Sequence, residues 1–216
     1  MQHLRSTGIA RAHLLVLLAA LAAGLGLWLA QSYRAGPPAG KAFETIFIYP
    51  QPRALPAFSL MAAQGETFLP EHLTGRWHLV FVGFTHCPDI CPTTLAELAQ
   101  VERRWTEALP EAQRPQTVFV SVDPERDSPE RALEYARYFS PTATAASGEL
   151  AALEGFARSL GMVFMKTPLE GDDYTIDHST HVALIDPQGR LAGIVRSPLD
   201  VAKLANDMIR LAGTDR

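Results

Sequence analysis

The sequence predicts an α/β domain, with a mixed central β-sheet flanked by helices, joined to an N-terminal transmembrane helix. Runs of apolar and β-branched residues at 78–84 and 117–122 are typical of buried strands, and a helical pattern follows each of them. The uncharged stretch 13–30 just meets the length needed to cross a bilayer. A chain of 216 residues has room for one good-sized domain and this appendage.

The apolar stretch 13–30 is expected to be an uncleaved membrane anchor. Arg5 and Arg11 precede it, and the first acidic residue is Glu44, so the positive-inside rule leaves residues 1–12 in the cytoplasm. A cleaved signal peptide is the alternative, but a tryptophan near the end of the stretch interrupts the small-residue pattern of a cleavage site. We therefore expect a single-pass protein of the inner membrane whose soluble domain lies on the periplasmic side.

Residues 31–43 are expected to be a linker, because the run Gly-Pro-Pro-Ala-Gly at 36–40 favours an extended spacer. The soluble domain is expected to occupy residues 44–216. Of the 19 Lys and Arg residues and 23 Asp and Glu residues, three arginines and no acid lie in residues 1–40, so the rest of the chain is acidic. An acidic domain of this kind argues against nucleic acid as a partner.

The other elements are expected from hydrophobic periodicity and from turn signals. Strands are expected where β-branched and aromatic residues gather between turn residues, at 45–49, in a hairpin of 58–60 with 66–68, at 78–84, at 117–122, and in a hairpin of 182–185 with 191–195. Helices are expected where apolar residues recur every three or four positions, at 92–109, from Pro129 behind the N-cap Ser128, at 148–160 and at 198–211. The segment from 161 to 181, rich in Pro, Gly and Asp, is expected to be mainly a loop. This order of elements is that of a thioredoxin-like fold.

The chain's two cysteines, Cys87 and Cys91, lie four residues apart directly after the expected strand 78–84. Thiolates are soft metal ligands and strong nucleophiles, and a strand-to-helix junction favours the ionised form through backbone N–H groups and the helix dipole. The pair therefore predicts either soft-metal binding or thiol–disulfide exchange. Compared with the usual redox spacing, the extra residue leaves more room for an ion. A purely structural disulfide is a third reading, but closing so short a loop would stabilise the fold little.

A metal site would need a third ligand, and histidine is the natural candidate. His86 adjoins Cys87, but adjacent side chains of an extended segment point to opposite sides, so we expect His86 to flank the site. His178 and His181 remain. Asp177 could orient the ring of His178, which favours His178, whereas His181 is expected to be structural.

Three carboxylates, Asp123, Glu125 and Asp127, resemble a metal-binding cluster at first sight. Because a proline separates the first two and the capping residue Ser128 follows, we expect them to form a tight turn that leads into a helix. They are therefore interpreted as structural.

Three motifs in this chain closely resemble the Sco/SenC family of membrane-anchored copper proteins. They are Gly-Phe-Thr-His-Cys-Pro-Asp-Ile-Cys-Pro at 83–92, Ser-Val-Asp-Pro-Glu-Arg-Asp at 121–127, and Asp-His-Ser at 177–179. The resemblance covers about residues 55–212, and the motifs occur in the order that the family shows. It implies a thioredoxin-like fold that binds one copper ion through two cysteines and a distant histidine.

By this resemblance, the copper ligands would be Cys87, Cys91 and His178, and copper would be Cu(I) or Cu(II). The resemblance also implies a metallochaperone that helps assemble the binuclear copper centre of cytochrome c oxidase. Its expected partners are the copper-binding subunit of the oxidase, a periplasmic copper donor, and a thiol reductant, since exported thiols tend to oxidise. The alternative is a thiol–disulfide reductase that keeps the acceptor's cysteines reduced and uses Cys87 and Cys91 as its redox pair.

Overall fold

The computed structural model describes residues 6–34, 43–171 and 173–214. Two compact units make up the chain, Met1–Ala42 and Phe43–Arg216. The second unit contains all the strands of the described chain, and it carries the cysteines and His178.

The N-terminal unit contains helix α1, which runs from Ser6 to Arg34. The side chains of α1 are described for residues 13–27 and are exposed. Among the described residues, no helix has both the length and the apolar character that crossing a membrane requires. The transmembrane helix expected at 13–30 is not shown by the structure and stays a prediction. Most of the linker expected at 31–43 lies outside the described residues.

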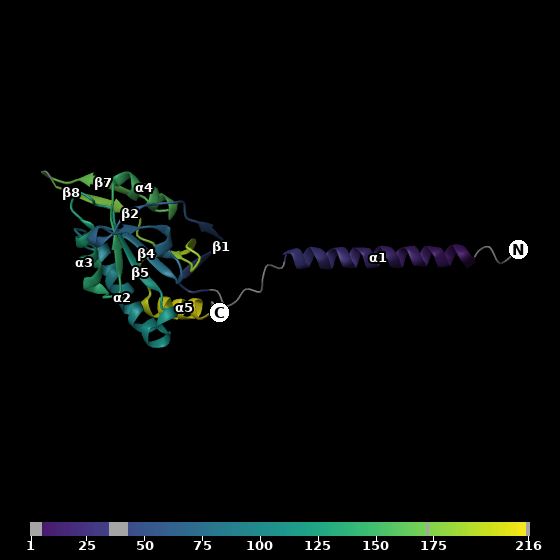
Figure 1. Ribbon diagram of the computed structural model, residues 1–216. Helices are drawn as coiled ribbons and strands as arrows, with labels where there is room; N and C mark the ends of the chain where they lie inside the picture. Colours follow the sequence, from purple (N-terminus) through teal and green to yellow (C-terminus); the bar gives the residue numbers. More distant parts are fainter. Residues whose placement is uncertain (1–5, 35–42, 172, 215–216) are drawn as a thin grey trace. The chain divides into compact units, whose positions relative to one another are not determined.

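The second unit is built on a six-stranded sheet whose strand order is β1-β10-β9-β4-β5-β6 (Figure 1). Strands β4, β5 and β6 are parallel, whereas β9, β10 and β1 join them through antiparallel pairing. The strand bounds are β1 Ile46–Ala54, β4 His78–Gly83, β5 Gln116–Ser121, β6 Thr144–Ala146, β9 Val182–Ile185 and β10 Arg190–Val195. The mixed sheet predicted from the sequence is confirmed.

Strand β4 lies at the centre of this sheet, and all six of its residues are buried. Its parallel register with β5 pairs His78 with Gln116 at one end and Gly83 with Ser121 at the other. The carboxyl ends of both strands therefore meet at the same edge of the sheet. The segments that leave this edge carry the cysteines after β4 and the carboxylate turn 123–127 after β5.

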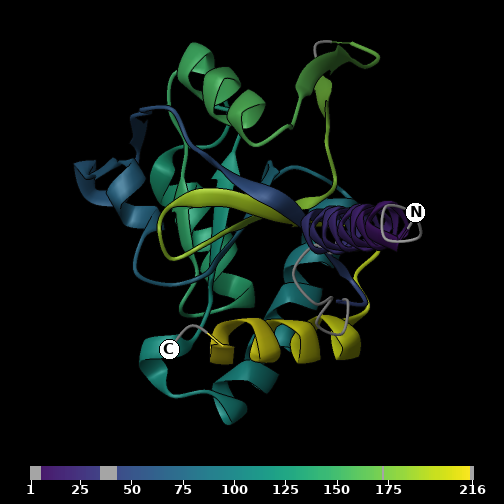
Figure 2. The ribbon, with the colours of Figure 1, turned by 90° about the vertical axis from the view of Figure 1, so that its right-hand side faces the viewer.

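Helices cover both faces of the sheet, as predicted. Helix α4 lies on one side, and α2 and α5, which pack against each other, lie on the other (Figure 2). Helix α3 packs against β5 and β6, and Ser128 caps it by accepting a hydrogen bond from the N–H of Arg131. The helix bounds are α2 Ile90–Ala108, α3 Pro129–Phe139, α4 Leu150–Ser159 and α5 Val201–Thr214, with short 3₁₀ turns at Ala63–Gly65, Pro70–Leu73 and Glu111–Gln113.

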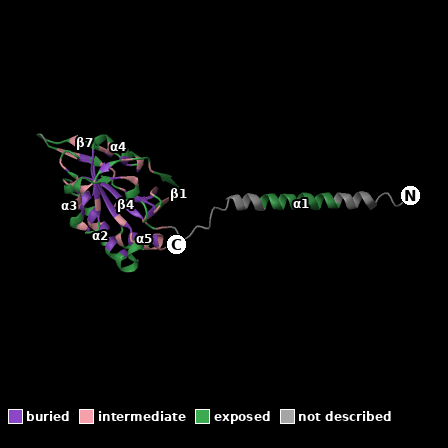
Figure 3. Ribbon diagram, viewed as in Figure 1, coloured by how far each residue is buried: buried purple, intermediate pink, exposed green. Residues whose placement is uncertain are grey.

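The hydrophobic core lies between the sheet and these helices (Figure 3). Helix α2 contributes Leu95, Leu98, Val101 and Trp105, which recur every three or four residues and are all buried. This spacing places them on one face of the helix, so α2 is anchored on the sheet along most of its length. Its first turn, which contains Cys91, is fixed by the same packing.

The segment expected to be a loop before β9 contains an antiparallel hairpin, so that prediction was wrong. Strand β7 (Phe164–Pro168) pairs with β8 (Tyr174–His178), and Gly171 in the connection has φ of 76°, which glycine adopts without strain. The short β6 was also not predicted. The hairpin of β2 (Leu60–Met61) and β3 (Thr67–Phe68), by contrast, lies where the sequence predicts one.

Candidate metal centre

Cys87 lies in the loop between β4 and α2, and Cys91 lies in the first turn of α2. The helix begins at Ile90, two residues earlier than expected, so Cys91 is inside it. The Cys91 N–H donates a hydrogen bond to the Cys87 sulfur, at 3.4 Å from N to Sγ. The N-cap residue Asp89 makes no such side-chain bond. The Cys87 sulfur therefore accepts from an otherwise unpaired N–H at the start of the helix, where the dipole favours negative charge.

The Cys91 side chain is completely buried, against the end of β4. A Cβ atom placed on Gly83 would lie 2.7 Å from the Cys91 sulfur and 3.1 Å from the ring of Phe119. Only glycine leaves room for the sulfur at this position. The end of β4 thus determines how closely Cys91 approaches the sheet.

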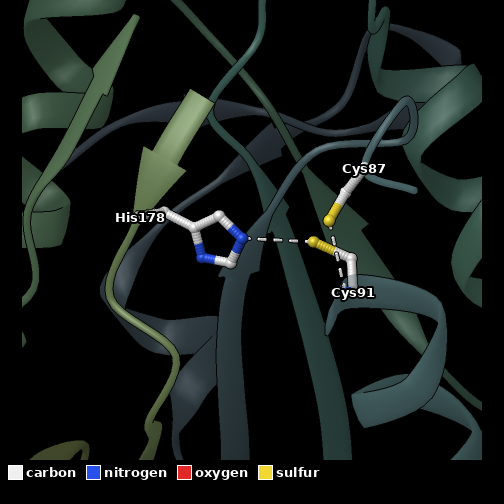
Figure 4. A group of neighbouring side chains, drawn as sticks. All are labelled: Cys87, Cys91 and His178. Carbon is white, nitrogen blue, oxygen red and sulfur yellow. Dashed lines mark hydrogen bonds between the residues drawn. The ribbon is translucent and has the colours of Figure 1, made fainter. Parts of the chain in front are cut away.

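His178 is the last residue of β8, and its ring faces the two sulfurs (Figure 4). Its Nε2 atom lies 3.3 Å from the Cys91 sulfur, and its Nδ1 atom lies 3.0 Å from the carbonyl oxygen of Ser179. Because a carbonyl can only accept, Nδ1 is the protonated nitrogen in this contact, and a neutral ring presents the Nε2 lone pair to the sulfurs. The rings of Phe81 and Phe84 pack against the imidazole at 5.9 and 6.0 Å between centroids.

The two sulfurs and the histidine nitrogen all lie within 4.8 Å of one another. An ion held at about 2.3 Å by each sulfur and about 2.0 Å by nitrogen separates its ligand atoms by at most about 4.6 Å. Small movements of these side chains would therefore let all three atoms contact one ion. Cys87 is partly exposed and Cys91 is buried, so such an ion would be approached from the side of Cys87.

The fold brings the three predicted ligands together. Of the two polar residues beside them, His86 lies as expected and Asp177 does not. His86 points away, with Nδ1 at 3.3 Å from the Thr85 hydroxyl, so it flanks the site as expected. The prediction that Asp177 orients His178 was wrong. The Asp177 carboxylate accepts from the hydroxyl of Thr167 at 2.6 Å, on the opposite side of the strand from the imidazole.

The two thiols differ strongly in acidity. A hydrogen bond from the Cys91 thiol lowers the pKa of Cys87 to about 4; burial opposes this effect, while the backbone N–H groups of Asp89 and Cys91 add to it. The same hydrogen bond, together with burial, raises the pKa of Cys91. At neutral pH, Cys87 is a thiolate, whereas Cys91 keeps its proton until it binds a metal or is oxidised.

Asp127, two residues before α3, holds the cysteine loop in place. Its buried carboxylate accepts hydrogen bonds from the Thr85 N–H at 2.8 Å, from the Thr85 hydroxyl, and from the Ser121 hydroxyl at 2.6 Å. Thr85 is two residues before Cys87, so the loop is tied to the end of β5. Sequence reasoning did not find this role of Asp127 or that of Gly83, although both lie within the motifs that it singled out.

A thioredoxin-like domain with two cysteines and a histidine at the edge of its sheet belongs to the class of thiol-containing metal-binding and redox proteins. The chain belongs to the SCO1/SenC family, whose model matches residues 49–213. This match covers most of the second structural unit and includes all three residues of the candidate site.

Individual relatives agree with this family. The chain is 35% identical over 173 residues to a Stutzerimonas stutzeri protein whose name proposes that it binds copper, covering 79% of this chain and 83% of that protein. It is 34% identical to the mitochondrial SCO1 homolog 1 of Arabidopsis thaliana over 71% of this chain, but it spans only 45% of that longer protein. The mitochondrial SCO2 homolog of mouse is 37% identical over 61% of this chain and 52% of its own length.

Solved structures show the same fold. The structure of Arabidopsis thaliana ScoI with copper bound has a TM-score of 0.67 and 33% identity, covering 72% of this chain and 96% of that one. The structure of Bradyrhizobium japonicum ScoI with copper bound has a TM-score of 0.65 and 32% identity, covering 73% and 98%.

The acidity of Cys87 can be tested by its alkylation rate. In the reduced protein, Cys87 should react with iodoacetamide at a rate nearly independent of pH between about 5 and 8, because its pKa of about 4 leaves it ionised throughout. Cys91→Ala removes the hydrogen bond, so the pKa of Cys87 should rise and its rate should fall as pH is lowered, by up to about tenfold per unit. Cys91→Ser, which keeps an O–H donor, is the matched control. Peptide mass mapping measures the alkylation rate of Cys87 in each variant. A rate that stays independent of pH in Cys91→Ala would show that the Cys91 thiol does not lower the pKa of Cys87.

The close contact at Gly83 predicts an effect on stability. Gly83→Ala should lower the free energy of unfolding by about 1–3 kcal/mol, because the added methyl group overlaps the Cys91 sulfur. Gly155→Ala in α4 is the control, since its Cβ would meet nothing within 4 Å and alanine favours a helix by roughly 0.5–1 kcal/mol. Urea unfolding should therefore show opposite signs for the two variants. If both variants changed the free energy of unfolding equally, the contact between Gly83 and Cys91 would not explain the loss of stability.

Proposed function

We propose that this protein binds one copper ion through Cys87, Cys91 and His178 and delivers it to the binuclear copper centre of cytochrome c oxidase. The observation that carries this proposal is the convergence of two sulfurs and one imidazole nitrogen within 4.8 Å. Family membership supports copper as the ion, since related chains with this fold have been solved with copper bound.

The donor set suits this metal. Two thiolates and an imidazole match Cu(I), and the same atoms can hold Cu(II), whereas a structural zinc site usually has four protein ligands. A site with three protein ligands leaves a position open for an incoming ligand. An acceptor's sulfur or nitrogen can then bind before the donor's ligands leave, so the ion is never released into water.

The difference between the two thiols sets the order in which they bind the ion. Cys87 is partly exposed and already ionised near neutral pH, so it is suited to meet an incoming ion first. Cys91 is buried and must lose its proton as it binds, with His178 packed beside it. Copper loading at neutral pH should therefore release a proton from Cys91.

The proposed cellular setting rests on the apolar stretch 13–30 and on Arg5 and Arg11 before it. We propose a single-pass protein of the inner membrane whose domain faces the periplasm, with the copper-binding subunit of the oxidase as acceptor. A periplasmic copper donor and a thiol reductant would supply the metal and keep both cysteines reduced. An N-terminal anchor would confine the donor to the surface where the oxidase lies, which raises its effective concentration.

Copper binding can be measured directly. The reduced protein should bind one copper, with two sulfur ligands and one nitrogen ligand in X-ray absorption spectra. His178→Ala should lose most tight binding, weakening the affinity by about 100-fold or more, equivalent to about 2.7 kcal/mol. His181→Ala is the control, because His181 lies three residues away on the same segment and outside the site. Full copper retention by His178→Ala with an unchanged nitrogen signal would exclude His178 as a ligand.

A thiol–disulfide reductase acting on the acceptor's cysteines is the second candidate function. It is favoured by the pairing of a partly exposed Cys87 with a buried Cys91 four residues later, an arrangement that suits an attacking and a resolving thiol. This function needs both cysteines and does not need His178.

The two functions predict different outcomes in cells. For a metallochaperone, His178→Ala should reduce assembly of active oxidase nearly as much as Cys87→Ser. A reductase role instead predicts that His178→Ala restores assembly fully while Cys87→Ser does not. Oxidase activity in membranes of a deletion strain complemented with each variant, at matched protein levels, is the measurement.

A further inference from the structure

The hairpin that carries His178 is separate from the central sheet. Strands β7 and β8 pair with each other and, within the described chain, with no other strand. Of β8, Ile176 is buried in the core, while Phe164 of β7 and Tyr174 of β8 are partly buried against it. Strand pairing therefore does not hold the hairpin on the sheet. The backbone restrains His178 only through the short connection to β9, which begins at Val182, and side-chain contacts hold the rest of the hairpin.

Two polar contacts connect Tyr174 to the turn 123–127 that follows β5. The Tyr174 hydroxyl donates to Asp123 at 2.7 Å, and the Arg126 guanidinium donates to the backbone carbonyl of Tyr174 at 3.1 Å. Arg126 also donates to the other oxygen of Asp123, at 2.5 Å. Asp123, Arg126 and Tyr174 thus form a closed set of contacts, which we call the clamp.

Ring contacts strengthen the clamp. The Arg126 guanidinium lies 3.7 Å from the centroid of the Tyr174 ring and 5.9 Å from that of Phe84. Phe84 packs in turn against the imidazole of His178. Arg126 therefore lies between the hairpin and the start of the cysteine loop, and only about a fifth of its side chain is exposed.

The polar contacts between the hairpin and the rest of the domain gather at the turn 123–127. Besides the clamp, Lys166 on β7 donates to both carboxylate oxygens of Glu125 at 2.7 Å, and Asp173 contacts Arg126 at 3.4 Å. Apart from the contacts of His178 with Cys91 and with the adjacent Ser179, the hydrogen bonds and ion pairs between the hairpin and the rest of the described domain end within the turn 123–127.

The same turn also holds the cysteine loop, through Asp127 and Thr85. One five-residue segment therefore contacts both the loop that carries the cysteines, at Thr85, and the hairpin that carries His178. The distance between Cys91 and His178 depends on this shared support.

We propose that Arg126 and Tyr174 are positioning residues of the metal centre, which hold the β7–β8 hairpin so that Nε2 of His178 faces Cys91. The inference rests on the proposed function only in taking His178 as a copper ligand. Its consequence is that opening the clamp withdraws His178 while Cys87 and Cys91 stay in place. The clamp then decides whether copper is held by three protein ligands or by two.

The first test needs no metal. Amide hydrogen exchange of the full-length, metal-free protein in detergent micelles should be at least about tenfold faster in β7 and β8 for Arg126→Gln and Tyr174→Ala, and unchanged in β4 and β5. Arg158→Gln is the matched control, since Arg158 makes an exposed ion pair with Glu154 on α4 and does not contact the hairpin. Unchanged exchange in the hairpin of both clamp variants would overturn the inference.

A milder variant keeps the test valid if Arg126→Gln fails to fold. Tyr174→Phe removes the hydroxyl bonded to Asp123 and keeps the ring that faces Arg126. It should give a smaller increase in exchange, confined to the same two strands. An increase spread over the whole sheet would indicate a general loss of stability and would overturn a positioning role.

The second test uses copper. Arg126→Gln should retain two sulfur ligands in X-ray absorption spectra, lose nitrogen signal, and release Cu(I) to a chelator about tenfold faster than the unmodified protein. In a His178→Ala background, Arg126→Gln should cause no further change, because the group that it positions is absent. An equal effect in both backgrounds would show that Arg126 acts on the thiolates or on the fold instead.

The two tests separate the inference from the proposed function. If the unmodified protein binds no copper, the proposed function fails, and the hydrogen-exchange result still decides whether Arg126 and Tyr174 hold the hairpin. If copper binds but neither the exchange nor the nitrogen signal changes, the proposed function stands and the clamp is excluded.

Discussion

The parallel pairing of β4 with β5 is the constraint on which the candidate metal centre depends. It places Gly83 beside Ser121, and the pairing continues one step further, with the Val122 N–H donating to the Gly83 carbonyl at 2.9 Å. The cysteine loop and the turn 123–127 therefore leave the sheet side by side. In open α/β sheets, ligand sites form at the carboxyl ends of the strands because loops converge there.

From this edge, the start of α2 sets the chemistry of the sulfurs. The helix N-terminus and the Cys91 thiol stabilise the Cys87 thiolate, while packing against Gly83 shields the Cys91 sulfur from water. One sulfur is thus accessible and charged, and the other is shielded and protonated. Such a pair can accept a soft ion stepwise, and it is equally the arrangement that thiol exchange requires, which is why the histidine separates the two functions.

Much of the fold could be predicted because its long helices and buried strands are indicated by patterns of residues close together in the sequence. The buried strands β4 and β5 are continuous apolar runs, the helices α2 to α5 have a helical periodicity, and Ser128 with Pro129 marks the start of α3. The hairpin β7–β8 was missed because Ile176 is the single buried residue of its two strands, so neither strand has a run of apolar residues. The error about Asp177 followed from this: in a strand, neighbouring side chains point to opposite sides, so Asp177 cannot face the same way as the imidazole.

By itself, the sequence determined the two-thiol pair, its place at a strand-to-helix junction, and the class of chemistry that such sulfurs perform, because these depend on residues close together in the chain. Only the tertiary structure decided which histidine meets them. His178 is separated from Cys91 by 87 positions, and spacing says nothing about a contact over that distance. The contact exists because the hairpin that carries His178 and the loop that carries the cysteines are both supported by the turn 123–127, and this arrangement depends on the sheet register.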